Sequence, residues 1–163
     1  MPLYHIRPLT NNDKNMVAQF VSERWGDEVV VGHGIVYAPA NLPGFVATQA
    51  DGKIIGLLTY TLADNSCEIV TIDSLLPDQG VGTALIEAVK EVALQQRCQR
   101  IWLITTNDNI NALRFYQKRG FVLAALHRNA LEQSRKLKPQ IPLLGEHGIP
   151  IRDEIELEML LNS

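Results

Sequence analysis

The sequence has little of what marks several large classes of protein. Its 163 residues carry 15 Lys and Arg against 18 Asp and Glu, a net charge of −3. Nucleic-acid-binding domains usually carry a basic stripe, so this balance argues against a nucleic-acid partner. No run of 18 apolar residues is present, which argues against a membrane span. The first ten residues, MPLYHIRPLT, lack the apolar segment of a signal peptide.

The residue spacings typical of metal sites and of common hydrolases are also missing. The four histidines show no HxxxH or HxH pattern, so no metal site is expected. Cys67 and Cys98 are the only cysteines, and without metal-ligand spacing they favour two reduced thiols in a cytoplasmic protein. No GxSxG motif nominates a nucleophile, although a Ser/His/Asp site assembled from distant residues stays open.

What is present is typical of one globular domain. Hydrophobic residues make up 46% of the chain, and no repeat or linker interrupts it. A chain of this length buries one sizeable core but is short for two. We therefore expect residues 1–163 to form a single domain.

The apolar pattern of the first half alternates between strand and helix. A helix is expected from Thr10, with Thr10 or Asn11 as its N-cap, to Trp25, with Gly26 ending it. Asp51-Gly52 is typical of a type I′ hairpin turn. Strands are expected at 3–7, 44–50, 53–62 and 66–76, and 28–37 reads as strand or loop.

The second half changes to a helical period. Helices are expected over 82–97 and from Asn107 or Asp108 to Arg119, and strands over 100–106, 121–126 and 154–161. Residues 127–150 read as a long loop with one helical turn near 130–136. The unit 66–106 requires a right-handed crossover between parallel strands. The expected fold is α/β (α+β), with a mixed, mostly antiparallel central sheet and helices on both faces.

Two glycines, Gly80 and Gly82, stand between a strand and a helix in the segment QGVGTA. Unpaired N–H groups and the positive dipole end make such a helix start a phosphate site, whereas the plain alternative is a tight turn. A P-loop needs GxxxxGK[ST], and no lysine follows here. A Rossmann loop needs a third glycine and an early βαβ unit, and neither fits.

The segment matches the pattern Q/R-x-x-G-x-G/A, and here the sequence resembles the GNAT superfamily of acetyl-CoA-dependent N-acetyltransferases. Downstream, NINALRFYQKRGF is similar to that superfamily's N-x-x-A-x-x-x-Y-x-x-x-G-F signature. The likeness covers about residues 44–126. Where the family often has a proline, the chain has Leu76, with Pro77 displaced by one. The matching signature residues are Asn109, Ala112, Tyr116, Gly120 and Phe121.

The resemblance implies a GNAT-like fold in which strands 66–76 and 100–106 splay apart to admit acetyl-CoA as the acyl donor. It places the donor's pantetheine against the strand and its pyrophosphate on the loop amides. The residues so implied are Ser74, Leu75, Leu76, Gln79, Gly80, Val81, Gly82, Thr83 and Ala84, together with Asn109, Ala112 and Tyr116.

The resemblance also implies catalytic roles. Tyr116 matches the tyrosine that lies near the thioester sulfur and acts as general acid, and a phenol with pKa near 10 is protonated at neutral pH. Glu68, eleven residues before Gln79, is the candidate general base. The alternatives are that Tyr116 only packs the helix against the sheet and that Glu68 is a solvated charge at a strand start. An amine that arrives already neutral would need no dedicated base. Strict alternation puts Asp73 on the face opposite Glu68, which excludes it as an equivalent base.

The acceptor is expected to be a primary amine of a small molecule or a peptide. We expect the segments 11–25, 28–43 and 127–150 to cover it. Residues 135–138, with three cations, read as a surface turn or a contact to the 3′-phosphate of CoA, and the strand 154–161 as an edge compatible with a homodimer. A non-catalytic acyl-CoA-binding sensor on the same fold is the alternative function. Candidate acceptor contacts are Trp25, His33, Tyr37, Glu146, His147 and Asp153.

Overall fold

A seven-stranded mixed sheet forms the centre of the computed structural model, which describes residues 3–76 and 79–161. Its strands lie in the order β1-β4-β5-β6-β7-β9-β8, and a separate hairpin pairs β2 with β3. Among the strand pairs that the described residues form, only β6 and β7 are parallel. The strands are β1 (Tyr4–Pro8), β2 (Val30–Gly32), β3 (Ile35–Tyr37), β4 (Gly44–Gln49), β5 (Ile54–Ala63), β6 (Ser66–Ser74), β7 (Arg100–Thr106), β8 (Val122–His127) and β9 (Glu154–Leu160).

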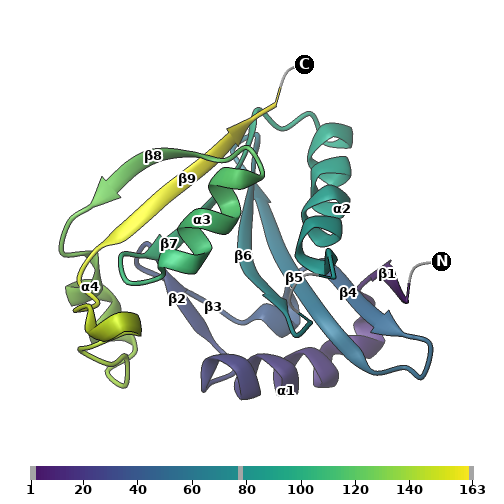
Figure 1. Ribbon diagram of the computed structural model, residues 1–163, viewed down its shortest axis with the longest axis horizontal. Helices are drawn as coiled ribbons and strands as arrows, with labels where there is room; N and C mark the ends of the chain where they lie inside the picture. Colours follow the sequence, from purple (N-terminus) through teal and green to yellow (C-terminus); the bar gives the residue numbers. More distant parts are fainter. Residues whose placement is uncertain (1–2, 77–78, 162–163) are drawn as a thin grey trace.

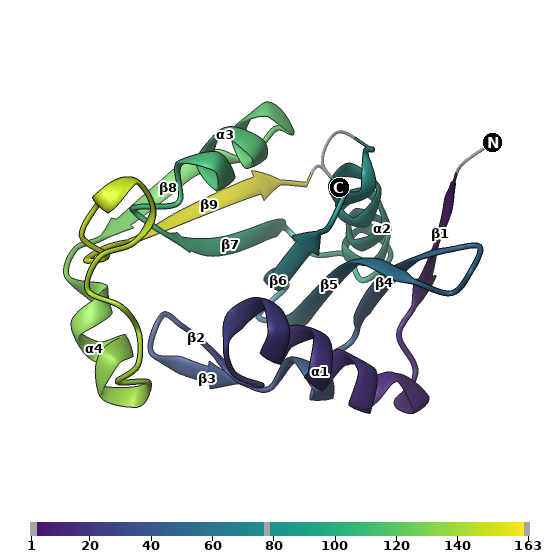
Figure 2. The same cartoon turned by 60° about the horizontal axis from the view of Figure 1, so that its bottom comes forward.

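Helices cover both faces of this sheet. On one face lie α2 and α3, and on the other lie α1 and the β2–β3 hairpin, with α4 beside the hairpin (Figures 1 and 2). The mixed sheet and the parallel crossover expected from the sequence are thereby confirmed. The helices are α1 (Lys14–Trp25), α2 (Val81–Gln95), α3 (Ile110–Lys118) and α4 (Ala130–Leu137), with short 3-10 turns η1 (Asn11–Asp13), η2 (Pro39–Asn41) and η3 (Glu146–Gly148).

Two hydrophobic clusters hold the layers together. The larger one packs α2 and α3 on the sheet through buried side chains such as Leu85, Ile101 and Leu157. The smaller one packs α1 on the opposite face through Val17 and Val21. Each apolar stripe of a helix is thus removed from water against one face, which is the main stabilising term in such a fold.

The type I′ geometry expected at Asp51-Gly52 is found at the next hairpin turn instead. At the β4–β5 turn only Gly52 has a positive φ, +85°, so this is not a type I′ turn. At the β5–β6 turn Asp64 and Asn65 both have positive φ, 54° and 61°, as type I′ requires. Asp-Gly is a typical type I′ pair, but here the loop contains one more residue, Ala50. The extra residue places Gly52 at the end of the turn.

The last strand is not an edge, contrary to the sequence expectation. Strand β9 pairs with β7 along one side and with β8 along the other. The edge is β8, all of whose residues are exposed. The chain returns through residues 128–153 to insert β9 between two earlier strands, and no local pattern encodes that order.

The segment 127–150 holds two turns of helix, α4, rather than the one predicted. It packs beside the hairpin, where Lys138 Nζ donates to the carbonyl of Val29 (3.0 Å). Arg135 Nη2 donates to the carbonyls of Pro142 and Ile151 at 2.7 Å each. These cations fasten the segment to itself and to the hairpin.

Both cysteines are buried and unpaired. Burial raises the pKa of the Cys67 thiol to about 12, with Cys98 and Glu68 nearby adding to the effect. No helix in the described part of the chain is long and apolar enough to cross a membrane.

Candidate functional site

Strands β6 and β7 lie side by side at one end and separate toward the other, so that their ribbons form a V (Figure 1). The two strands pair at only three positions, from Ser66↔Arg100 to Glu68↔Trp102, although both continue for several residues. A cavity of about 910 Å³ lies on the open side of this V. It is lined by β6, β7, the start of α2 and one side of α3, which confirms the predicted splay.

The β6 edge that faces this cleft has backbone groups free to bind a ligand. Leu75 N donates to Ile55 O (2.8 Å), so Leu75 points its amide at β5. Because backbone polar groups alternate along a strand, Ser74 and Ile72 point theirs away from β5, into the cleft. Ser74 and Leu76 line the cavity, whereas Leu75 packs against the α1 cluster.

The glycine loop supplies N–H groups at the mouth of the same cavity. Gly80 is the N-cap of α2, with φ +75°, and the first bond within the helix runs from Ala84 N to Gly80 O. The amides of residues 81–83 therefore have no acceptor within the helix. A Cβ at Gly82 would lie 2.8 Å from Phe115 Cζ, so a side chain there would require the ring or the loop to shift. These amides and the helix dipole suit a pyrophosphate. Pro77 and Asp78 lie outside the described residues.

Cationic side chains around the cavity were missed in the sequence. Among the residues that the structure describes, four basic side chains and one acid, Asp73, line it. A polyanion such as CoA fits this balance. Arg119 was detectable in principle, because it stands three residues after Tyr116 on the same helical stripe. The four are Arg24, Arg114, Lys118 and Arg119.

Tyr116 lies on the cavity side of α3, packed edge-on against Phe115 and Phe121. It is only 7% exposed, and burial, with a smaller effect from Asp73, raises the pKa of its hydroxyl. The phenol therefore stays protonated at neutral pH. Asn109, not Asn107 or Asp108, caps the helix: its Oδ1 accepts from Ala112 N at 3.2 Å. Asn109 and Ala112 also line the cavity.

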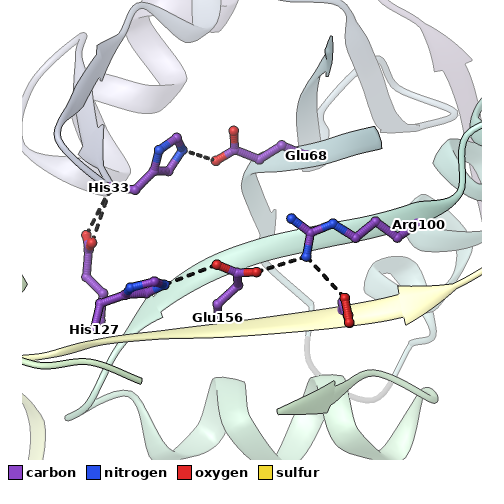
Figure 3. Close-up of polar contacts among 7 residues, drawn as sticks. His33, Glu68, Arg100, His127 and Glu156 are labelled. Carbon is purple, nitrogen blue, oxygen red and sulfur yellow. Dashed lines mark hydrogen bonds and ion pairs between the residues drawn. The ribbon is translucent and has the colours of Figure 1, made fainter. Parts of the chain in front are cut away.

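Glu68 stands at the apex of the V, where the strand pairing ends, and is 6% exposed. The Tyr37 hydroxyl donates to its Oε1 (2.8 Å), and His33 Nε2 lies 2.8 Å from its Oε2 (Figure 3). An ionised carboxylate only accepts hydrogen bonds, so Nε2 carries the proton in that state. The hairpin is thus tied to the sheet through this carboxylate, which is more than a solvated charge.

A bulge in β6 overturns the predicted side-chain alternation. Thr59 pairs with Thr71, but Tyr60 pairs with Ile69, so Val70 is an extra residue. Asp73 therefore shares the face of Glu68, contrary to the sequence prediction. Its carboxylate accepts a 2.8 Å hydrogen bond from Trp25 Nε1, and burial raises its pKa. The two acids therefore lie on the same face of β6, and what sets Asp73 apart is its hydrogen bond from Trp25.

A second cavity of about 130 Å³ adjoins the first. The two share six lining residues, among them Trp25, Val70 and Asn109. The hairpin, including Tyr37, lines the small cavity, and among the described residues Glu68 and Glu154 are its only charged lining residues. Among the predicted acceptor contacts, Trp25 and Tyr37 therefore line this space, and His33 braces Glu68.

The other predicted acceptor contacts do not reach either cavity. Glu146 and His147 are exposed in η3, and the Glu146 amide donates to Asp108 Oδ2 (2.9 Å). Asp153 is paired with Arg152 and accepts from Asn129 N. These contacts hold the 127–150 segment beside the hairpin, and none of its residues lines either cavity. In the described ranges, no group of three or more His, Cys, Asp and Glu side chains is placed to hold a metal.

Comparisons with known proteins agree with this geometry. The Acetyltransferase (GNAT) family profile matches residues 12–121. The protein YdhI of Bacillus subtilis (strain 168) is 48% identical over 150 residues, covering 90% of this chain and 93% of YdhI. An IAA acetyltransferase from Bacillus cereus ATCC 14579 has a TM-score of 0.73 at 22% identity, covering 97% of this chain and 99% of that one.

A GNAT family acetyltransferase from Elizabethkingia anophelis, solved with acetyl-CoA bound, has a TM-score of 0.69 at 21% identity. That likeness covers 99% of this chain and 100% of the other. Both structural likenesses concern the fold, and the profile match extends over more than half of the sequence. The chain therefore belongs to the GNAT acetyltransferase family.

Proposed function

We propose that this chain moves the acetyl group of acetyl-CoA directly to a primary amine of a small molecule or peptide, as one domain in the cytoplasm. One observation carries the proposal: the loop amides, the open β6 edge and Tyr116 all face a single cavity, which Glu68 adjoins at its apex. The structural neighbour with acetyl-CoA bound supports the choice of donor.

The donor fits the residues present. Amides 81–83 and the cations of α3 suit the pyrophosphate, and the Ser74 and Ile72 backbone suits the amide groups of pantetheine. Loop residues Gln79 to Ala84 bind through their main chain in this arrangement. Bound in this way, the donor supplies an activated thioester carbonyl inside the V.

Tyr116 and Glu68 divide the proton transfers. Glu68, or solvent, takes one proton from the ammonium so that a neutral amine can attack. As the C–N bond forms and the C–S bond breaks, Tyr116 gives its proton to the departing sulfur and regains one from the nitrogen. The products are an amide and free CoA, with one proton released. A protonated, buried phenol suits the donor role.

The proposal is tested by measuring CoA release with a panel of amines that includes polyamines, aminoglycosides, amino acids and peptides. Thermal unfolding with CoA gives an independent readout, since a ligand at 100 times its Kd adds about 2.7 kcal/mol of stability. CoA binding with no turnover across the panel would favour the sensor alternative. No CoA-dependent shift at all would rule out both functions.

A further inference from the structure

In the described part of the chain, the side chains that line the small cavity include two acids and no Lys, Arg or His. Of its lining residues, Glu68 and Glu154 are charged, and the others are apolar or neutral. The apolar walls come from α1, the hairpin, β6 and β7, in the form of Trp25, Val30, Val31, Ile69, Val70 and Ile104. A cavity of this composition selects a ligand with an aliphatic body and cationic ends.

Glu154 is the more unusual of the two acids. It is 3% exposed, and its two oxygens share one donor, the backbone N–H of His33, at 3.2 Å each. No Lys or Arg within the described ranges forms an ion pair with it, and the nearby groups whose positive charge lowers its pKa are His33 and His127. A carboxylate buried with so little compensation is costly, and a cation in the cavity would offset that cost.

Glu68 differs from Glu154 because each of its oxygens already has a hydrogen-bond partner, Tyr37 for one and His33 for the other. The same residue, His33, meets Glu68 through its ring and Glu154 through its main chain, which fixes the two carboxylates relative to each other. Glu68 lies at the apex of the cleft, whereas Glu154 lies across the cavity on β9. The cavity therefore presents two separate negative points.

We infer that the acceptor is a compact dication, a primary amine joined by a short aliphatic chain to a second cationic group. The reacting amine lies at the Glu68 end, and Glu154 binds the second group. At ~30 Å³ per liquid water, 130 Å³ corresponds to about four waters, enough for a chain of about four to six non-hydrogen atoms. A carboxylate at that end is repelled. The inference rests on the proposed function and names its acceptor class.

Three amines with the same four-carbon chain differ only in the group at the far end, and so test the role of the second group: 1,4-diaminobutane, butylamine and 4-aminobutanoate. The expected order of kcat/KM has the diamine at least tenfold above butylamine, and butylamine above 4-aminobutanoate. In Glu154→Gln the diamine advantage falls to threefold or less while CoA affinity stays unchanged. Glu156→Gln is the matched control. It removes an acid on the same strand and face that lines neither cavity, and it keeps the preference.

Calorimetric titration of 1,4-diaminobutane into the protein with CoA gives a readout independent of turnover. Glu154-dependent binding without acetylation of any amine would support this site and overturn the proposed function. Acetylation of other amines, with the diamine neither bound nor preferred, would overturn this inference alone. A diamine preference that survives in Glu154→Gln would also overturn it.

Discussion

Arg119 Nε donates a 2.8 Å hydrogen bond to Oγ1 of Thr83, joining the end of α3 to the first turn of α2. The same guanidinium stacks 3.7 Å above the Phe115 ring and donates to the Phe115 carbonyl. The tyrosine helix and the glycine loop are distant in sequence, yet this residue fastens them into one wall of the cavity. It also places a positive charge beside the loop amides.

Replacing Arg119 by Met keeps the length of the side chain but removes its charge and donors. We expect the Kd for CoA to rise about 5- to 20-fold, since a hydrogen bond or contact to a charged group contributes about 1–2 kcal/mol. Isothermal titration with CoA measures the change. Arg128→Met is the control because Arg128 is exposed and lies outside both cavities. Equal Kd values for the two variants would contradict a role for Arg119 in donor binding.

Gly82→Ala tests the close approach of α2 and α3. The new Cβ would meet the tip of Phe115, whose ring is held by Arg119, so either the ring or the loop must shift. Overpacking of this kind costs about 1–3 kcal/mol, and we expect a Tm lower by about 2–10 °C with weaker CoA binding. Adding Phe115→Leu frees the space and restores part of the Tm. An unchanged Tm in Gly82→Ala would show that the ring moves freely.

Local patterns made much of this site predictable. The glycine turn, the helical period after it and the tyrosine helix are each encoded within about a dozen residues, and they locate the donor side. Arg119 was missed because a single cation on a helix is usually solvated. Arg119 lies on the same side of α3 as Phe115 and Tyr116. That position indicates a role at the cleft only once α3 is known to face the cleft.

The acceptor side was less predictable for two physical reasons. The Val70 bulge inserts one residue into β6 without a sequence signal and reverses which side chains share a face. Glu154 lines the same small cavity as Glu68 only because β9 inserts between β7 and β8, an order fixed by the whole sheet. The acids of β9 alternate visibly with Ile155, Leu157 and Met159, but their neighbours do not follow from that alternation.

Tyr116→Phe removes one hydroxyl from the cavity. If Tyr116 is the general acid, kcat falls about 10²-fold while the Kd for CoA changes less than twofold. Single-turnover acetylation, with CoA affinity measured in parallel, separates the two quantities. Tyr60→Phe is the matched control, since Tyr60 is a buried tyrosine in the same cluster that does not line the cavity. A kcat for Tyr116→Phe within twofold of the unmodified enzyme would assign this phenol to packing.

Glu68→Gln keeps the shape of the side chain and removes the base. We expect kcat/KM for the amine to fall at least tenfold at pH 7 and the deficit to shrink as pH approaches the pKa of the amine, where no base is needed. The pH profile of kcat/KM distinguishes this from a structural defect, which would lower the rate equally at every pH. Glu156→Gln, on the same face of β9 as Glu154 but outside both cavities, should leave the profile unchanged.

The raised pKa of Glu154 leads us to expect that acceptor binding depends on pH. Its pKa is raised above the ordinary 4.5, first by burial and also by Glu68, while the His33 amide and the charges of His33 and His127 oppose the rise. A dication binds the ionised form. Raising the pH above 4.5 through the Glu154 pKa should therefore lower KM for 1,4-diaminobutane more than KM for butylamine. A parallel change in both would contradict the assignment.

The raised pKa of Glu154 has the opposite consequence for stability in the absence of ligand, because ionising this buried carboxyl destabilises the folded chain. A buried carboxyl with a raised pKa contributes most at low pH, where it is neutral, and its contribution is lost as pH rises through the folded-state pKa. Glu154→Gln should therefore gain thermal stability relative to the unmodified chain at pH 7 but not at pH 4. Adding 1,4-diaminobutane at pH 7 should narrow that gap, because the dication stabilises only the chain that retains the carboxylate. A gap of equal size at both pH values would mean that Glu154 stays protonated and cannot serve as the second anionic point of the acceptor cavity.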